Sequence, residues 1–266
     1  MADDLVLYEI RDGVALVTLN RPERMNAWTT ELQNQYFDVL DRAVEDPEAG
    51  AIVVTGAGRG FCPGADMDVL QGGGRGAEGI TAAVSRPVIY PLSVPKAIVG
   101  AINGACAGLG MVQALMMDVR FAAAGAKFTT AFVRRGLIAE HGISWMLPRL
   151  VGTSNASDLL LSGRVFTSEE ALELGLVNRV FPGEVLLDEA LAYARDIAKN
   201  CAPASVAVMK GQLLRHQNLD VEAALEDSNA LMRKSLKRPD FKEGVSSFVE
   251  KRPPAFAPLD RSTLAG

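Results

Sequence analysis

The sequence predicts an α/β fold on three observations. Two apolar runs, at residues 51–55 and 97–101, have the length and composition of buried strands. Each run is followed by a glycine-rich turn, and the second turn leads into the apolar segment 111–117, which predicts a buried helix. From about residue 184 onward, apolar and charged residues alternate with helical period.

The amino-terminal segment predicts a β-hairpin followed by a helix. Residues 5–10 and 14–19 are expected to form two strands, and the Asp12-Gly13 pair between them is a hairpin signal. Thr29 or Thr30 can cap a helix that continues to Ala43 and stops near Pro47, since both residue types favour those positions.

The middle of the chain predicts a loop, a helix and three strands. The glycines within residues 71–76 indicate a mobile loop. A helix around residues 80–91 is expected to lead into the strand at 97–101. Residues 119–123 and 127–129 are expected to form two further short strands.

The carboxy-terminal part predicts four helices. Their apolar and charged faces alternate over residues 184–199, 203–216, 221–235 and 239–250. Pro203 and Pro239 suit first helical turns, where the missing N–H of proline leaves no intrahelical hydrogen bond unmade.

Composition and charge limit the classes of function. The chain has 266 residues, 48% hydrophobic and 22% charged, as expected for a soluble globular protein with a sizeable core. A formal net charge of −5 does not indicate a nucleic-acid partner. Asp3 and Asp4 stand where a signal peptide needs positive charge, and no apolar run approaches the roughly 18 residues of a membrane span. We therefore expect a cytoplasmic protein without a membrane partner.

Cysteine and histidine usage argues against a disulfide framework and a metal site. Cys62, Cys106 and Cys201 are an odd set without CxxC spacing, as expected for reduced thiols. His141 and His216 are the only histidines, and no ligand cluster suits zinc. No metal is expected.

The glycine-rich turns are candidates for anion binding. A strand, a glycine-rich turn and a helix place unpaired backbone N–H groups at the helix start, where they can stabilise a phosphate or an oxyanion. Such a turn serves just as often only to let the strand and the helix pack closely, without binding an anion. In the first turn the glycines fall at 56, 58 and 60, which is not GxGxxG, and no P-loop lysine follows. A nucleotide-binding fold is therefore not indicated.

Several motifs together resemble one known family. They are Asn-Arg-Pro-Glu-Arg-Met-Asn-Ala at 20–27, Gly-Phe-Cys-Pro-Gly-Ala-Asp at 60–66, Asn-Gly at 103–104 with Gly-Leu-Gly at 108–110, Gly-Leu at 136–137 with Gly142 and Leu-Pro-Arg-Leu-Val-Gly at 147–152, and Ala-Leu-Glu-Leu-Gly-Leu-Val at 171–177. In order and spacing they are similar to the crotonase family, also called the enoyl-CoA hydratase/isomerase superfamily. The resemblance spans roughly the whole chain.

The resemblance implies a fold and an assembly that periodicity alone does not give. It implies a spiral core of repeated β-β-α units over residues 1–200, with the acyl-CoA site, and a C-terminal helical region over 201–266. It further implies that this helical region packs against neighbouring subunits in a homotrimer, commonly doubled to a hexamer. A helical cap on the chain's own core remains the alternative.

The resemblance also assigns an acyl-CoA thioester as the substrate, so coenzyme A is part of the substrate and no separate cofactor is expected. Two backbone N–H groups would hold the thioester oxygen and stabilise an enolate: by motif position, those of Ala65 and Leu109. Leu109 departs from the glycine of many members, and its side chain would narrow the acyl pocket. The further residues expected to contact substrate are Arg24, Met25, Ala27, Gly64, Asp66, Met67, Gly108, Val112 and Phe132.

The hydratase pattern is broken at two positions. Family hydratases use two glutamates, one as a base on water and one as an acid at the α-carbon. These positions correspond to Val112 and Phe132, and neither side chain can transfer a proton. Hydratase activity is therefore in doubt.

Glu140 supplies a different carboxylate. Residues 136–142 resemble the segment that holds the single acid of peroxisomal-type Δ3,Δ2-enoyl-CoA isomerases, and dienoyl-CoA isomerases place an aspartate there. One carboxylate suffices to move a proton from C2 to C4, and apolar side chains at 112 and 132 would exclude water. An acid that only caps the following helix is the structural alternative. His141 is expected to be structural, because adjacent side chains usually diverge.

The sequence supports an enoyl-CoA isomerase, in fatty-acid metabolism such as β-oxidation, as its first interpretation. An enoyl-CoA hydratase that uses an unaligned acid is the second. A non-catalytic acyl-CoA-binding relative is the third, and another reaction of the family stays open.

Overall fold

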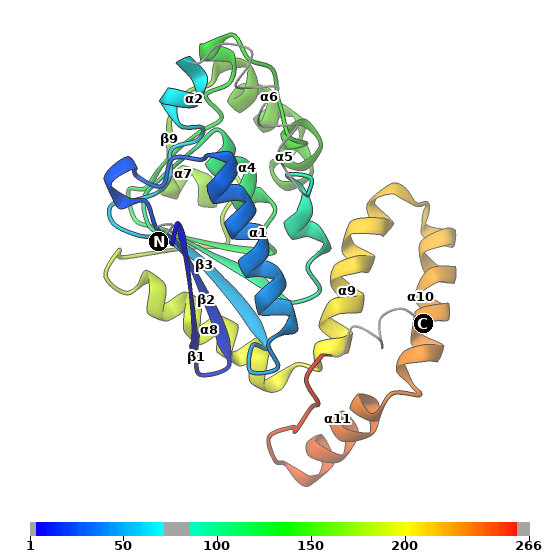
Figure 1. Ribbon diagram of the computed structural model, residues 1–266. Helices are drawn as coiled ribbons and strands as arrows, with labels where there is room; N and C mark the ends of the chain where they lie inside the picture. The colour runs from blue at the N-terminus through cyan, green and yellow to red at the C-terminus, as the bar shows by residue number, and fades with distance from the viewer. Residues whose placement is uncertain (1–3, 72–85, 260–266) are drawn as a thin grey trace.

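The computed structural model describes residues 4–71 and 86–259. Its main sheet has six strands in the order β1-β2-β3-β5-β7-β10 (Figure 1). These strands are β1 (Val6–Arg11), β2 (Val14–Leu19), β3 (Ala51–Gly56), β5 (Ile98–Ile102), β7 (Val119–Ala123) and β10 (Arg179–Phe181). β1 and β2 form the expected antiparallel hairpin, and every other neighbouring pair is parallel.

A second, smaller sheet is interleaved with the first along the chain. It has the order β4-β6-β8-β9, with strands β4 (Gly60–Cys62), β6 (Ala105–Ala107), β8 (Lys127–Thr129) and β9 (Phe166–Thr167). In sequence, β4 follows β3, β6 follows β5 and β8 follows β7, and a helix follows both β4 and β6. This alternation confirms the expected repetition of strand–strand–helix units.

The central strands are buried because parallel strands are covered on both faces. Every residue of β3 and β5 is buried, and their sequences are almost wholly apolar. The one polar side chain there, Thr55, donates a hydrogen bond to the Ala101 carbonyl at 2.8 Å, which satisfies its buried hydroxyl. The apolar runs that predicted these strands therefore mark the centre of the main sheet.

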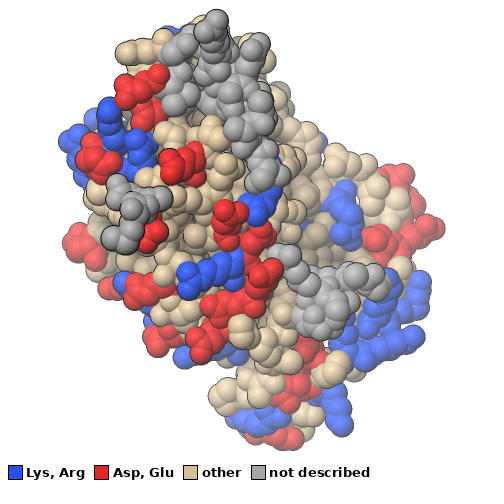
Figure 2. Space-filling model, viewed as in Figure 1, with Lys and Arg blue, Asp and Glu red and all other residues tan. Residues whose placement is uncertain are grey.

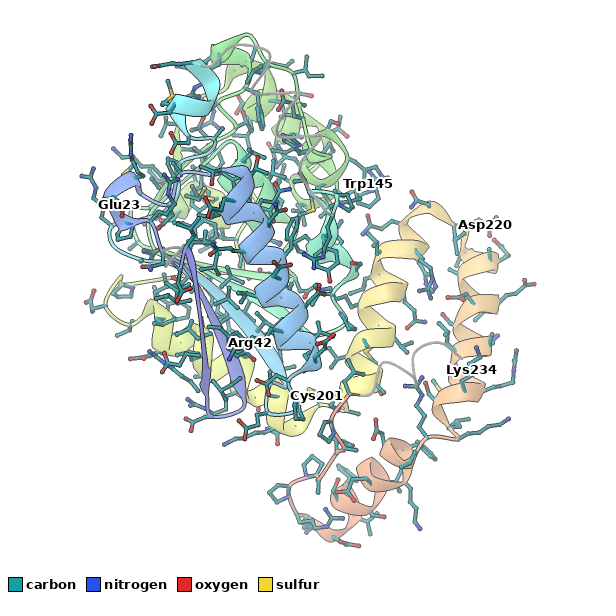
Figure 3. The ribbon with its side chains drawn as sticks, in the orientation of Figure 1. Glu23, Arg42, Trp145, Cys201, Asp220 and Lys234 are labelled. Carbon is teal, nitrogen blue, oxygen red and sulfur yellow. The ribbon has the colours of Figure 1, made fainter. Side chains whose placement is uncertain are left out.

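Helix α1 (Thr30–Glu45) packs against β1 and β2, and helix α8 (Leu186–Asn200) lies against β3 and β5. The Thr29 side chain caps α1 by accepting a hydrogen bond from the Leu32 N–H, as the sequence predicts. Near its end, Arg42 projects over the ring of Tyr8, with 4.1 Å between guanidinium carbon and ring centroid (Figure 3). This contact fastens α1 to the hairpin.

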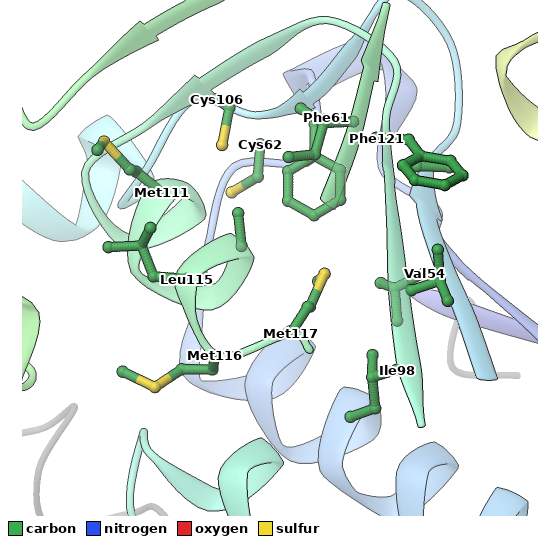
Figure 4. Close-up of a cluster of buried hydrophobic side chains, with 14 of the residues drawn as sticks. Val54, Phe61, Cys62, Ile98, Cys106, Met111, Leu115, Met116, Met117 and Phe121 are labelled. Carbon is green, nitrogen blue, oxygen red and sulfur yellow. The ribbon is translucent and has the colours of Figure 1, made fainter. Parts of the chain in front are cut away.

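Helix α4 (Leu109–Leu115) is buried along its whole length. The side chains of Met111 and Leu115 lie beside Cys62 on β4 and Cys106 on β6 in the core (Figure 4). Burial raises the pKa of the Cys62 thiol to about 12 and that of Cys106 well above its usual value. Both groups are therefore protonated packing residues.

The other helical elements before α8 are the 3₁₀ helices η1 (Pro22–Arg24), η2 (Tyr90–Ser93) and η3 (Val133–Arg135), and the helices α2 (Met67–Gln71), α5 (Ile143–Val151), α6 (Thr153–Ser162) and α7 (Ser168–Glu173). The 3₁₀ helix η4 (His216–Asn218) lies after α8.

Helices α9 (Pro203–Arg215), α10 (Val221–Ser235) and α11 (Pro239–Glu250) stand beside the rest of the molecule (Figure 1), and we call them the C-terminal arm. Cys201 ends α8 and lies exposed at the junction with the arm (Figure 3). The arm's residues 203–250 bury little: Ala204 on α9, nothing on α10 and Ser247 on α11.

One of the expected elements differs from the structure, and another lies outside the described residues. Half of the expected helix at 80–91, and all of the expected loop at 71–76 except Gln71, fall on residues 72–85, which lie outside the described residues. The part of the former that is described is wrong as a prediction: residues 86–89 form no helix, and Tyr90–Ser93 is a 3₁₀ turn. Pro87 and Pro91 lack the N–H groups that an α-helix needs there.

Charges of both signs mix on the surface. Figure 2 shows acidic and basic side chains together over α1, where Arg86 pairs with Asp38 at 2.8 Å and with Asp41 at 2.7 Å. Basic side chains gather at the carboxyl end of α10, where Arg233 and Lys234 suit the helix dipole. Throughout residues 4–71 and 86–259, no helix combines the length and apolarity that crossing a membrane requires.

Candidate active site

The two glycine-rich loops predicted to form the site pack backbone against backbone. A methyl group on Gly110 would lie 2.2 Å from the Cys62 carbonyl oxygen, which excludes any side chain there. A methyl group on Gly64 would lie 3.0 Å from the Ala107 carbonyl oxygen, and Gly64 has a φ of +103° that favours glycine. The loop after β4 and the start of α4 therefore touch.

Ala65 is held so that its N–H points away from the amino-terminal loop. The Gly64 carbonyl accepts a hydrogen bond from the Trp28 N–H at 2.8 Å, and the Asp66 N–H donates to the Trp28 carbonyl at 2.9 Å. Because successive N–H groups of an extended segment alternate in direction, the Ala65 N–H faces the opposite side. It has no acceptor in the part of the chain that the structure describes.

Leu109 is the first residue of α4 and offers a second free N–H. Gly108 precedes it with φ +49° and ψ −120°, and its own N–H donates to the Thr129 carbonyl at 3.1 Å. The Leu109 N–H belongs to the first helical turn, which has no intrahelical acceptor, and no described residue accepts it. A methyl group on Gly108 would lie 3.7 Å from the Gly64 Cα, so the two predicted donors follow glycines that are in contact.

Two asparagines fix these loops, and sequence reasoning gave neither of them a role. The Asn26 amide is fully buried and donates to the carbonyls of Ala57, Gly60 and Phe61 at 2.9–3.1 Å. Asn103 donates to the Gly56 carbonyl at 2.9 Å. Asn26 has a φ of +64°, a conformation that asparagine tolerates better than most residues. This preference of asparagine is the sequence signal that could have indicated its role in the loop.

Asp66 orders its own loop through two contacts. Its Oδ1 accepts the Asp68 N–H at 3.0 Å, and its Oδ2 lies 3.1 Å from Arg21 Nη2. The Asp68 N–H and then the Arg21 guanidinium hold the pKa of this buried carboxyl below its usual value. Arg21 also donates to the Ala27 carbonyl at 2.6 Å, which ties the amino-terminal loop to the Asp66 loop.

Several of the residues expected to contact substrate lie around the same loops. Ala27 is buried beside the Trp28–Ala65 bridge, and Met25 Cβ lies 3.6 Å from where a methyl group on Gly60 would be. Met67 is 52% exposed at the start of α2. Arg24 forms an exposed ion pair with Asp68 at 3.1 Å, so its guanidinium is already partnered in the structure.

The two positions that carry glutamate in hydratases are apolar and buried. Val112 lies one turn into α4 and is 0% exposed, and Phe132, just before η3, is 7% exposed. Next to Val112, Gln113 is also buried: its Nε2 donates to the Val88 carbonyl at 3.2 Å, and its Oε1 has no partner among the described residues. None of these three side chains is a carboxylate.

Glu140 lies in the loop between η3 and α5, and its side chain is 34% exposed. Its carbonyl accepts the Ile143 N–H at 3.1 Å at the start of α5. The expectation that Glu140 and His141 diverge is wrong: His141 Nε2 lies 3.1 Å from Glu140 Oε2. The physical reason is the left-handed backbone of His141, with a φ of +57°, which turns the imidazole back towards the preceding residue.

Within residues 4–71 and 86–259, no group of three or more histidine, cysteine, aspartate or glutamate side chains could hold a metal ion. The described residues thus supply two backbone N–H groups without an acceptor, on loops that touch, and one carboxylate paired with a histidine, on the separate loop before α5.

Comparison with known proteins identifies the family. The family model for enoyl-CoA hydratase/isomerase matches residues 9–258. The 1,2-epoxyphenylacetyl-CoA isomerase of Escherichia coli strain K12 is 34% identical over 258 residues, covering 95% of this chain and 98% of that protein.

Solved structures agree. A probable enoyl-CoA hydratase/isomerase from Mycobacterium abscessus is 34% identical, with a TM-score of 0.85 over 96% of this chain and 99% of the other. An enoyl-CoA hydratase from Mycobacterium marinum is 50% identical, with a TM-score of 0.69 over 79% of this chain and 97% of the other. The chain that carries the free Ala65 and Leu109 N–H groups is therefore a member of the enoyl-CoA hydratase/isomerase family.

Proposed function

We propose that this enzyme is a Δ3,Δ2-enoyl-CoA isomerase in which Glu140 is the single acid–base residue. The observation that carries the proposal is the contrast between Glu140 and the two buried apolar residues, Val112 and Phe132. Isomerisation needs one carboxylate and no water, whereas hydration needs groups that position water. The subtype rests on this contrast.

In the proposed reaction, the Glu140 carboxylate removes a proton from C2 of a 3-enoyl thioester. The electrons move into the thioester carbonyl and form a dienolate, whose oxygen accepts hydrogen bonds from the Ala65 and Leu109 N–H groups. The Glu140 carboxyl then returns the same proton to C4, which gives the conjugated 2-enoyl thioester. Protons and electrons balance without a co-reactant.

The magnitudes are adequate for catalysis. A positioned acid–base residue contributes about 10²–10⁴-fold to a rate, and each preorganised oxyanion donor contributes about 3 kcal/mol. The apolar side chains of Leu109, Val112 and Phe132 exclude water from the acyl group, which strengthens both effects.

We further assign the coenzyme A portion of the substrate to Arg24, Met25, Ala27, Gly64, Asp66 and Met67, and a further substrate contact to Gly108. Their clustering beside the Ala65 loop supports this assignment. Binding the phosphates would require Arg24 to exchange Asp68 for a phosphate oxygen, and Arg–phosphate pairs are strong enough to make that exchange reasonable.

Enoyl-CoA hydratase is the second candidate, because the 50% identical protein from Mycobacterium marinum is called a hydratase. The 34% identical protein from Escherichia coli is called an isomerase. A catalytic water in this chain would have to be positioned by an acid that does not align with the two hydratase glutamates, such as Glu140.

One paired assay separates the candidates. The absorbance of the conjugated enoyl thioester is followed with 3-hexenoyl-CoA and, separately, with 2-hexenoyl-CoA. We expect a rise with the first substrate and no fall with the second. A fall with the second would overturn the isomerase assignment in favour of hydration. No change with either would indicate a non-catalytic acyl-CoA binder or another reaction of the family.

A further inference from the structure

The turn that carries Glu140 has an uncommon backbone. His141 has a φ of +57° and Gly142 a φ of +80°, so two successive residues adopt the left-handed conformation. This conformation is unfavourable for a residue with a Cβ, although histidine is enriched among the exceptions. A non-glycine residue held there by its surroundings marks a place where a functional role is worth testing.

The consequence of the turn is a close contact between neighbouring side chains. His141 Nε2 lies within hydrogen-bonding distance of Glu140 Oε2, at 3.1 Å. The His141 side chain is 21% exposed and the Glu140 side chain 34% exposed, so the contact is partly shielded from water.

The state of the histidine follows from its surroundings. Burial lowers the pKa of His141, and this effect exceeds the opposing attraction of the Glu140 carboxylate. The imidazole is therefore neutral at pH 7 and has one N–H to donate. Donated to Oε2, it leaves Oε1 as the oxygen free to accept a proton from substrate.

We propose that His141 is a positioning residue that holds the Glu140 carboxylate in the orientation the double-bond shift requires. The inference rests on the proposed function. One carboxyl must accept a proton at C2 and deliver it at C4, so it must reach both carbons without rotating away. An anchored Oε2 leaves Oε1 to move the proton between the two.

The chain contains a matched control. His216 Nε2 lies 2.8 Å from Asp227 Oδ2, an equivalent histidine–carboxylate pair that joins the end of α9 to α10 in the C-terminal arm. Removing His216 should leave the isomerisation rate unchanged, which separates the effect of the pair at Glu140 from that of losing any such pair.

The test measures kcat and KM with 3-hexenoyl-CoA for His141→Ala, His141→Gln and His216→Ala. Misplacement of a reacting group costs on the order of 10²-fold. We therefore expect His141→Ala to lower kcat by about that factor with KM unchanged, and His141→Gln, which keeps an N–H donor, to recover most of it. In a Glu140→Ala background, His141→Ala should have no further effect.

A second readout distinguishes positioning from general damage. In D₂O, a loosened carboxylate should exchange its proton with solvent before delivery, so deuterium incorporation per isomerisation should rise in His141→Ala. Wild-type kcat in His141→Ala, no recovery in His141→Gln, or an unchanged deuterium ratio would each overturn the inference. Full activity in Glu140→Ala would instead overturn the proposed function itself.

Discussion

At the scale of single residues, the side chains at positions 112, 132 and 140 separate the candidate reactions. The positions occupied by Val112 and Phe132 offer only buried hydrocarbon, while Glu140 is partly exposed and contacts His141. The sequence predicted this division through a resemblance between motifs. It did not predict the contact with His141, because the orientation of two adjacent side chains depends on a backbone φ that composition does not reveal.

Replacing the proposed acid–base residue should abolish turnover and spare binding. We expect Glu140→Ala and Glu140→Gln to lower kcat with 3-hexenoyl-CoA by about 10²–10⁴-fold, since Glu140 is the acid–base residue of the proposed reaction. The affinity for a saturated acyl-CoA, measured by calorimetry, should stay within a few-fold of wild type, as it should in the remote control Glu222→Gln. A near-wild-type rate in either Glu140 variant would remove Glu140 from the mechanism.

The carboxyl of Asp66 should make stability depend on acid pH. Its folded pKa lies below the unfolded value of about 3.9, because the Asp68 N–H and Arg21 favour the charged form. The stabilisation is therefore present above that value and is lost as pH falls through the folded pKa.

The measurement is the free energy of unfolding in urea between about pH 6 and pH 3. Wild type should lose stability more steeply towards low pH than Asp66→Asn does, and Asp68→Asn, whose side chain is 70% exposed, should follow wild type. Parallel curves for wild type and Asp66→Asn would refute this account of the loop.

At the scale of elements, the site depends on two loops that approach more closely than side chains permit. Gly110 on α4 faces the Cys62 carbonyl, and Asn26 ties the neighbouring loop to residues 57–61. The apolar runs of β3 and β5 and the periodic helices α10 and α11 could be predicted from sequence because their signals are local. The strands β4, β6 and β9 have three residues or fewer and are defined by distant pairing, so local patterns do not show them.

A methyl group should therefore have opposite effects in two helices. In Gly110→Ala the new Cβ would meet the Cys62 carbonyl at 2.2 Å, and we expect a loss of about 1–3 kcal/mol of stability together with loss of turnover. In Gly244→Ala on α11, the nearest atom would be 3.8 Å away. The higher helix propensity of alanine should therefore raise the free energy of unfolding, by at most about 1 kcal/mol. Thermal unfolding and the 3-hexenoyl-CoA assay check both; a tolerated Gly110→Ala would show that the loops can separate without cost.

At the scale of the whole molecule, the C-terminal arm lacks a core of its own. Large apolar side chains stay exposed along it, including Leu213 at 73%, Leu225 at 60% and Phe248 at 84%. Apolar surface of this extent favours contact with another chain. We propose that the C-terminal region of residues 201–266, which contains the arm, mediates a homotrimer, or a hexamer as a dimer of trimers, around the core of residues 1–200.

Light scattering after size-exclusion chromatography should give about three or six times the 28.3 kDa of the chain. A Leu213→Glu/Leu225→Glu variant should shift towards the single-chain mass, because burying two charges in an apolar interface is costly. Gln217→Glu, which adds one charge nearby, should keep the wild-type mass. A wild-type protein of single-chain mass at micromolar concentration would contradict the trimer.

The burial of two of the three cysteines allows the C-terminal arm to be labelled selectively with a dye. Cys62 and Cys106 are enclosed in the core and held as thiols, whereas Cys201 is exposed where α8 meets α9. A maleimide dye added to the folded wild-type protein should label one position, at the junction of α8 and α9, without engineering the sequence. Its fluorescence would then report on movement or assembly of the arm while Cys62 and Cys106 in the core stay unmodified.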